Sequence, residues 1–222
     1  MDDPSLWARP RRGARGPAPE YGLADIATAA IRIATSGGLA AVSMRAVANQ
    51  LGTTASTLYH YVASRDELLD LMVDTAMADF VVDPRPGRDW LSELERLAEA
   101  MLRHYLAQPW LLDARPARSV PGPNTLRWFE YCLEAMRSLD QPARTKMETI
   151  GVLSGVIVLF ARNATAPAAF GFDALDPGRH PLLAAALTDL ADDRPGPHLF
   201  QRTIRAVLTG LVNPPTHQSK RR

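Results

Sequence analysis

The sequence contains very little cysteine and almost no net charge. Cys132 is the single cysteine among 222 residues, so an internal disulfide is impossible and a reducing compartment is expected. The formal net charge is only +1, which excludes a protein that is basic over its whole surface. These two features argue against a disulfide-stabilised secreted protein and favour a cytoplasmic one.

Long apolar runs and strand patterns are missing as well. The longest apolar run, IGVLSGVIVLFA (150–161), is too short to span a bilayer. No apolar stretch follows the N-terminal arginines, as a secretory signal would require. We find no alternating strand pattern and no internal repeat. The sequence therefore predicts a soluble all-α protein with no membrane partner.

The chain also lacks the motifs that mark many enzymes and metal proteins. HExxH, paired CxxC, P-loop and GxSxG sequences do not occur, and the five histidines are scattered. We therefore predict no catalytic residue, no metal site and no cofactor. An enzyme or a small-molecule carrier that uses a helical cavity stays open as an alternative to regulatory DNA binding.

Helical signals are abundant. The hydrophobic share of 46% over 222 residues suits one or two compact domains. Ile26, Ala30 and Ile33 recur at helical spacing after Gly22, and Gly37–Gly38 ends this first helix. Further helices are predicted from Ser43 to Leu51, then after Thr53 or Thr54 as N-cap, and from Ser64, which forms a capping box with Glu67. Others are predicted from Asp89 to the interruption at 108–110, from Asn124 as N-cap to about Leu139, and at 142–165, 181–191 and 197–212.

The stretch TTASTLYHYV (53–62) has more polar residues than a core needs. Ala48, Gly52 and Leu58 have the spacing of a helix-turn-helix, with the glycine in the turn where a positive φ is easily adopted. With Leu58 and Val62 inward, the polar residues must point outward. They are Thr54, Ser56, Thr57, Tyr59 and His60, with Tyr61 at the edge. Short hydroxyls and amphipathic rings suit base edges and phosphates in the major groove.

Positive charge is concentrated near the N-terminus. Residues 9–65 hold seven arginines and two acids, a local excess of 7 − 2 = +5. Such a local field attracts polyanions. Residues 1–19 are rich in proline, glycine and arginine and are expected to be disordered when alone.

The sequence AVSMRAVANQLGTTASTLYHYVASRDELLDLM (41–72) resembles the DNA-binding domain of TetR-type transcriptional repressors. The resemblance covers about residues 22–72. It implies a homodimer that binds a palindromic operator in double-stranded DNA, and an all-helical C-terminal domain whose small-molecule effector releases the DNA. The expected parts are a basic arm (1–19), a DNA-binding domain (20–66), an effector-binding and dimerisation domain (67–215) and a basic tail (216–222).

The same resemblance implies roles for individual residues. Ser43 would cap the second helix and meet a phosphate, and Arg45 would reach a base or the backbone. Thr54, Ser56 and Thr57 would begin the recognition helix. Tyr59 and Tyr61 would contact phosphates or sugars, with His60 near base edges and Arg65 on the backbone.

The recognition helix itself holds no arginine or lysine. A guanine-reading arginine must therefore come from Arg45 or from the arm. We expect Arg11, Arg12 and Arg15 to enter the adjacent minor groove or to line phosphates. The alternative for the arm is an unstructured solubility tail.

The C-terminal region supplies candidate effector contacts. Apolar walls with a few polar groups describe a small-molecule pocket. The candidates are His104, Trp110, Trp128, Tyr131, Arg162 and Asn163, although an interior hydrogen-bonded histidine is an equal alternative for His104. Val81 stands near the first position where the tetracycline-binding branch has a histidine, which argues against a magnesium-bound tetracycline.

Two apolar stripes predict the dimer interface. Ile150, Leu153, Ile157 and Phe160 form one, and Phe200, Ile204, Val207 and Leu211 form the other. Soluble monomers avoid large exposed apolar patches, so packing against a second copy is expected to cover both stripes. The alternative is that both stripes face the core of their own chain.

Overall fold

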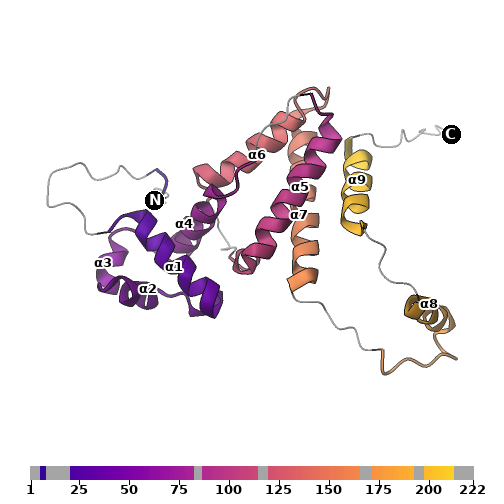
Figure 1. Cartoon of the computed structure of the whole chain (residues 1–222), viewed down its shortest axis with the longest axis horizontal. Helices are drawn as coiled ribbons and strands as arrows, with labels where there is room; N and C mark the ends of the chain where they lie inside the picture. Colours follow the sequence, from indigo (N-terminus) through magenta and orange to yellow (C-terminus); the bar gives the residue numbers. More distant parts are fainter. Residues whose placement is uncertain are drawn as a thin grey trace, which may run out of the picture. The chain divides into compact units, whose positions relative to one another are not determined.

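The computed structural model describes residues 6–8, 21–82, 87–114, 120–165, 172–192 and 198–212. Throughout this described part, every regular element is a helix, which confirms the all-α prediction. The chain packs as two compact units, Met1–Leu139 and Asp140–Arg222 (Figure 1). The expected basic tail (216–222) and most of the expected arm lie outside the described residues.

The first unit begins with three helices that pack around α1. Helix α1 (Leu23–Gly37) contacts the short η1 (Leu39–Ala41), α2 (Met44–Leu51) and α4 (Arg65–Ala78), and α3 (Ala55–Tyr59) packs on α2 (Figure 1). The predicted inward residues Ile26 and Ala30 are completely buried. Gly38 ends α1 with φ 73°, so the glycine pair stops the helix as predicted.

Helix α4 (Arg65–Ala78) begins with Ser64 as its N-cap, as predicted. The main-chain N–H of Glu67 donates to the Ser64 hydroxyl, and the Glu67 carboxylate accepts from the main-chain N–H of Ala63 at 2.7 Å. Buried residues lie on more than one side of the helix, because it contacts both α1 and α6 (Pro123–Ala135). Asp70 and Asp74 are among its buried residues, which the sequence pattern did not reveal.

Helices α5 (Trp90–Ala107) and α6 (Pro123–Ala135) complete the first unit, with η2 (Pro109–Leu112) between them. Asp89 caps α5 as predicted, accepting from the main-chain N–H of Ser92 at 3.0 Å. The prediction that Asn124 caps the next helix is wrong, because the N-cap position of α6 is Gly122. A carboxylate of α4 supplies the missing cap, as described below.

The second unit holds α7 (Ala143–Thr165), α8 (Pro181–Asp192) and α9 (Leu199–Val212), close to the predicted ranges. Helices α7 and α9 lie side by side, and the Phe160 and Phe200 rings meet edge to face with centroids 5.1 Å apart (Figure 1). The Nε2 amide of Gln141 also donates to the carbonyl of Val212, which fixes the end of α9 beside the start of α7.

The two predicted apolar stripes are largely buried within one chain. Ile150, Leu153 and Ile157 of α7 are at most 1% exposed. On α9 the buried residues are Phe200, Ile204, Leu208 and Val212, so the buried face follows steps of four, whereas Val207 and Leu211 are half-buried. The stripes are therefore not a free face awaiting a partner, and the expected interface residues have to be revised.

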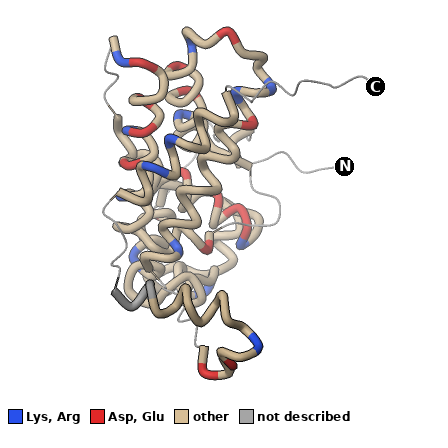
Figure 2. The backbone as a smooth tube through the Cα atoms, turned by 90° about the vertical axis from the view of Figure 1, so that its right-hand side faces the viewer, with Lys and Arg blue, Asp and Glu red and all other residues tan. Residues whose placement is uncertain are grey.

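One described helix, α7, is long and apolar enough to cross a membrane by length and composition alone. The helix is longer than the apolar run at residues 150–161, because it continues on both sides of that run. Acidic and basic residues are interspersed along the described helices rather than separated (Figure 2).

Candidate nucleic-acid interface and ligand site

The turn between α2 and α3 has the geometry that the sequence predicted. The Ser43 hydroxyl caps α2 by accepting from the main-chain N–H of Ala46 at 3.1 Å. Gly52 ends the helix in the left-handed region, with φ 70° and ψ 25°. A residue with a Cβ adopts this conformation at a higher energy, so the glycine allows the tight turn that orients α3.

Helix α3 presents a small polar surface. Ser56 and His60 are exposed, and Tyr59 keeps 53% of its surface exposed. Leu58 and Val62 are completely buried, and half-buried Tyr61 packs against the core. The predicted division between inward and outward residues is confirmed for these positions.

Thr54 and Thr57 have a structural role in addition to the predicted DNA contact, and Thr54 is one of the two residues predicted to cap this helix. Thr54 is exposed, but its hydroxyl caps α3 by accepting from the main-chain N–H of Thr57 at 3.2 Å. The two hydroxyl groups also share a hydrogen bond of 3.0 Å, and Thr57 is half-buried. These hydroxyls therefore hold the start of α3 in place and are only partly available to an external partner.

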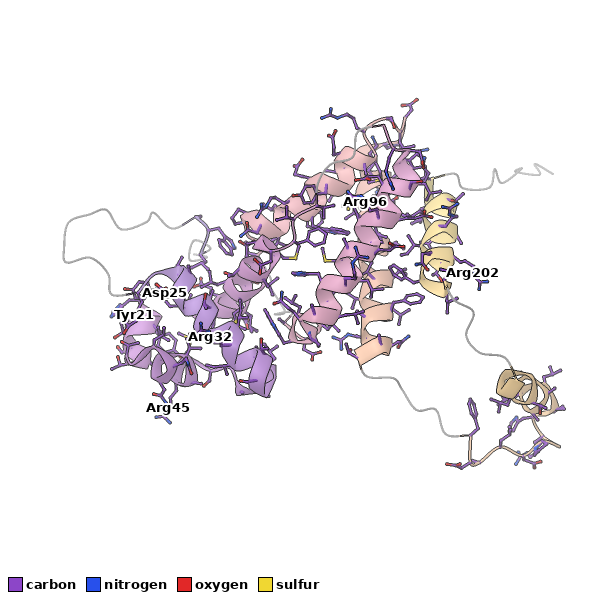
Figure 3. All side chains as sticks on the ribbon, in the orientation of Figure 1. Tyr21, Asp25, Arg32, Arg45, Arg96 and Arg202 are labelled. Carbon is purple, nitrogen blue, oxygen red and sulfur yellow. The ribbon has the colours of Figure 1, made fainter. Side chains whose placement is uncertain are left out.

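Arg45 and Arg65 border the same surface. Arg45 is exposed and projects outward from α2 (Figure 3). Arg65 donates to the carbonyl groups of Leu39 and Val42 at 3.3 and 3.4 Å, a structural role that the sequence did not suggest. A guanidinium has five N–H groups, so these two bonds leave donors for a phosphate. Arg11, Arg12 and Arg15 lie outside the described residues.

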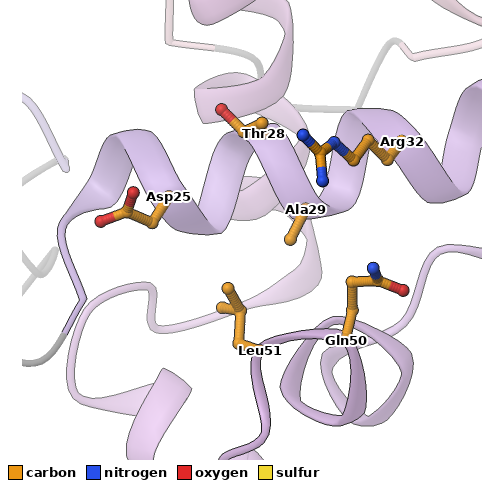
Figure 4. A pocket seen from close by; sticks show the side chains of 6 residues that line it. All are labelled: Asp25, Thr28, Ala29, Arg32, Gln50 and Leu51. Atoms are coloured by element: carbon orange, nitrogen blue, oxygen red, sulfur yellow. The ribbon is translucent and has the colours of Figure 1, made fainter.

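Sequence reasoning also missed Tyr21, which fixes the start of α1 against the end of α2. Its hydroxyl donates to the carbonyl of Leu51 at 2.6 Å, thereby satisfying an end carbonyl of α2. Next to it, α1 and α2 border an open hollow of about 230 Å³ (Figure 4). Its lining includes Asp25 and Arg32 from α1 and Gln50 from α2, so this face carries charges of both signs.

A group of aromatic side chains gathers around Phe80, just after α4. The Phe80 ring lies edge-on to His104 and Trp128 with centroids 5.8 Å apart, and 6.3 Å from Tyr131. We call these four residues the Phe80 cluster. The structure thus brings together three of the predicted ligand residues, around a phenylalanine that the sequence did not single out.

His104 is the polar member of the Phe80 cluster. Its Nε2 atom is buried without a hydrogen-bond partner among the described residues. Loss of hydration lowers the pKa of His104 below the ordinary value, opposed by the negative charge of Asp79. An open hollow of about 260 Å³ lies beside this imidazole and is also lined by Phe80 and Arg103.

The other predicted ligand residues lie elsewhere. Trp110 is buried in the core that α1 and α4 share, and its Nε1 has no partner among the described residues. Arg162 and Asn163 are exposed in the last turn of α7, in the second unit. Cys132 is completely buried, and burial raises the pKa of its thiol far above the ordinary range, as expected for a packing residue. The described residues contain no group of three metal-ligating side chains.

Two family models match almost the whole described chain. Residues 26–72 match the model of bacterial regulatory proteins of the tetR family, and residues 83–212 match the tetracyclin repressor-like C-terminal domain. The first match spans α1 to the middle of α4, which includes the helix-turn-helix. The second spans the Phe80 cluster members on α5 and α6 and the three helices of the second unit, α7, α8 and α9.

Individual proteins are also similar. The repressor DrrR1 of Streptomyces coeruleorubidus is 36% identical over 160 residues, which is 71% of this chain but 59% of DrrR1. This chain can be superimposed on almost the full length of ActR from Streptomyces coelicolor, which has been solved in two relevant states. Apo ActR gives a TM-score of 0.74 at 25% identity, over 88% of this chain and 97% of ActR. ActR in complex with actinorhodin gives a TM-score of 0.72 at 26% identity, over 88% of this chain and 98% of ActR.

Proposed function

Because the chain belongs to the tetR family of bacterial regulatory proteins, we propose that it is a homodimeric cytoplasmic repressor that a small, largely apolar effector releases from a palindromic operator. Its fold and family are those of transcriptional regulators rather than enzymes. The chain spans only 56 to 59% of the length of the first curated relatives, so operator, effector and assembly belong to this proposal.

The exposed face of α3 is the observation that carries the proposal. Ser56, Tyr59 and His60 are exposed beside Leu58, which is completely buried. An exposed tyrosine and histidine next to a glycine-closed turn are suited to contact with DNA in the major groove. Arg45 on α2 and the remaining donors of Arg65 would bind phosphates on either side, and Arg11, Arg12 and Arg15 would add contacts from the arm.

The Phe80 cluster is our proposed effector site. Aromatic rings supply large apolar contact area, and a buried His104 Nε2 without a partner among the described residues can bond a ligand hydroxyl or carbonyl. The structural likeness to ActR, which was solved in complex with actinorhodin, supports a small-molecule ligand in this part of the fold. Trp110, Arg162 and Asn163 lie outside this cluster, so only the sequence pattern supports them as ligand contacts.

A second copy of the chain would cover the exposed side of α7. Val152 and Leu159 are 41% and 56% exposed, and they accompany the exposed glycines Gly151 and Gly155. Apart from the chain neighbours and the backbone of α7 itself, no described atom lies within 4 Å of a Cβ built at either glycine, so another helix can approach closely there. This surface replaces the buried stripes as the proposed dimer contact.

Selection of binding sites from a pool of random duplex DNA tests the operator. We expect enrichment of a palindrome whose half-sites are about 34–36 Å apart, one turn of DNA. Thermal unfolding with actinorhodin as the probe tests the effector site, with His104→Leu as the variant expected to lose the shift. Stabilisation by the probe without any enriched DNA would instead favour a small-molecule-binding protein without regulatory DNA binding.

A further inference from the structure

The N-terminal residues Leu6 and Trp7 dock against a segment 113 positions away in the sequence. The Nε1–H of Trp7 donates a hydrogen bond of 2.9 Å to the carbonyl of Val120. Leu6 is buried and belongs to the core that includes residues of α1 and α4. This corrects the expectation of disorder for these residues, because two large apolar side chains supply enough contact to hold the segment in place.

Gly122 provides the space that Trp7 needs. A Cβ built on Gly122 would lie 2.6 Å from Cζ2 of Trp7 and 2.3 Å from Cγ of Asp74, both impossible distances. The φ of Gly122 is −83°, which any residue adopts, so the glycine is required for close packing and not for its backbone conformation. Trp7, α4 and the start of α6 thus meet at one backbone position.

Two carboxylates of α4 hold the same segment from their own side. Oδ2 of Asp70 accepts from the main-chain N–H of Val120 at 3.1 Å, and Oδ1 of Asp74 accepts from that of Thr125 at 2.8 Å. The N–H of Val120 is therefore bonded to α4, while its carbonyl is bonded to Trp7. Residues 120–125, which lead into α6, are clamped between α4 and the N-terminal segment.

The opposite end of α4 is fastened to the helix-turn-helix. Arg65 in its first turn binds the carbonyl groups of Leu39 and Val42, directly before α2. Ser64, the N-cap of α4, follows α3 by only a few residues. A displacement of α4 at the α6 contact would therefore be transmitted to the surface that carries Tyr59.

We propose that Trp7 is a positioning residue that fastens the start of α6 to α4, and that operator affinity depends on this fastening. The dependence of operator affinity on this fastening rests on the proposed function, whereas the fastening itself does not. Without Trp7, residues 120–125 would lose the bond to the Val120 carbonyl and the ring contact at Gly122, and α4 would have more freedom relative to the start of α6.

Amide hydrogen exchange of the full-length protein tests the fastening directly. Trp7→Ala removes the ring and the donor, and we expect exchange at Val120 and Thr125 to become about tenfold faster. Trp7→Phe keeps most of the ring packing but loses the donor, so it is expected to lie between Trp7→Ala and the wild type. Circular dichroism checks that each variant retains its helix content.

Operator titration at several salt concentrations tests the positioning role. We expect Trp7→Ala to weaken binding several-fold while leaving the salt slope unchanged, because every arginine remains. The control is the triple variant Arg11→Gln, Arg12→Gln and Arg15→Gln, which keeps Trp7. It is expected to leave exchange at Val120 unchanged and to make the salt slope shallower, by about one for each phosphate that an arginine no longer neutralises.

The exchange and titration results test the fastening and the positioning role separately. Wild-type exchange at Val120 and Thr125 in folded Trp7→Ala would overturn the fastening. Faster exchange with unchanged operator affinity would overturn the positioning role alone. If the wild-type protein binds no DNA, the proposed function and the positioning role both fail, and the exchange measurement still decides the fastening.

Discussion

The main-chain N–H of Thr125 donates a hydrogen bond of 2.8 Å to Oδ1 of Asp74, so a side chain of α4 caps α6. The Asn124 side chain donates to Oδ2 of the same carboxylate at 2.9 Å. Helix α6 has no acidic residue in its own first turn, and its N-cap is a glycine. The negative charge that favours a helix N-terminus therefore comes from another helix.

We expect Asp74→Ala to lower the free energy of unfolding by about 1–3 kcal/mol, because it leaves buried N–H groups without an acceptor. Asp74→Asn retains one acceptor oxygen and is expected to have a smaller effect. Urea unfolding followed by circular dichroism measures both. The exposed Asp173→Ala serves as control, and equal stability of Asp74→Ala and this control would show that the cap contributes nothing.

Adjacent residues of α3 are expected to separate DNA affinity from stability. Tyr59→Ala removes an exposed ring and is expected to weaken operator binding by roughly 1 kcal/mol, with an unchanged melting temperature. Leu58→Ala truncates a completely buried side chain and is expected to lower stability by about 2–5 kcal/mol. Anisotropy titration and thermal unfolding measure the two effects. A lowered melting temperature with normal affinity for Tyr59→Ala contradicts the outward role.

His104 is expected to make stability depend on pH. Burial lowers its pKa from the ordinary 6.5, so below pH 6.5 the unfolded chain binds more protons than the folded one. The free energy of unfolding therefore falls as the pH drops through this region, and the loss is complete below the folded pKa. His104→Gln is expected to flatten this part of the profile relative to wild type in urea unfolding between about pH 5 and 8. The exposed His60→Gln is the control, and an equal flattening by both variants contradicts the role of burial.

Gly155 tests the proposed dimer surface without disturbing the single chain. An added Cβ meets no described atom of its own chain, and replacing a glycine within a helix stabilises it by about 0.5–1 kcal/mol. We therefore expect Gly155→Leu to shift the protein toward the monomer in light scattering, with its helix content retained. Ile204→Glu is a poor test, because Ile204 is only 1% exposed and the variant is expected to unfold the chain. A Gly155→Leu protein that remains a stable dimer places the interface elsewhere.

The sequence by itself determined features whose causes lie within a few residues. Ser64 and Glu67 start α4, and Gly52 closes the turn, because capping bonds and a positive φ depend on local chemistry. Helical periodicity likewise predicted Leu58 as buried and Tyr59 as exposed, because only one face of a short helix can pack against a core.

Only the tertiary structure decided the features that join distant segments. The cap of α6 comes from Asp74 and not from Asn124, and Trp7 binds Val120, because these pairs meet only after the helices have packed. On α9, Leu208 is completely buried while Val207 is half-buried, a choice set by the angle at which α9 lies on α7. Local patterns record which side chains can be buried, whereas the geometry of packing determines which atoms they meet.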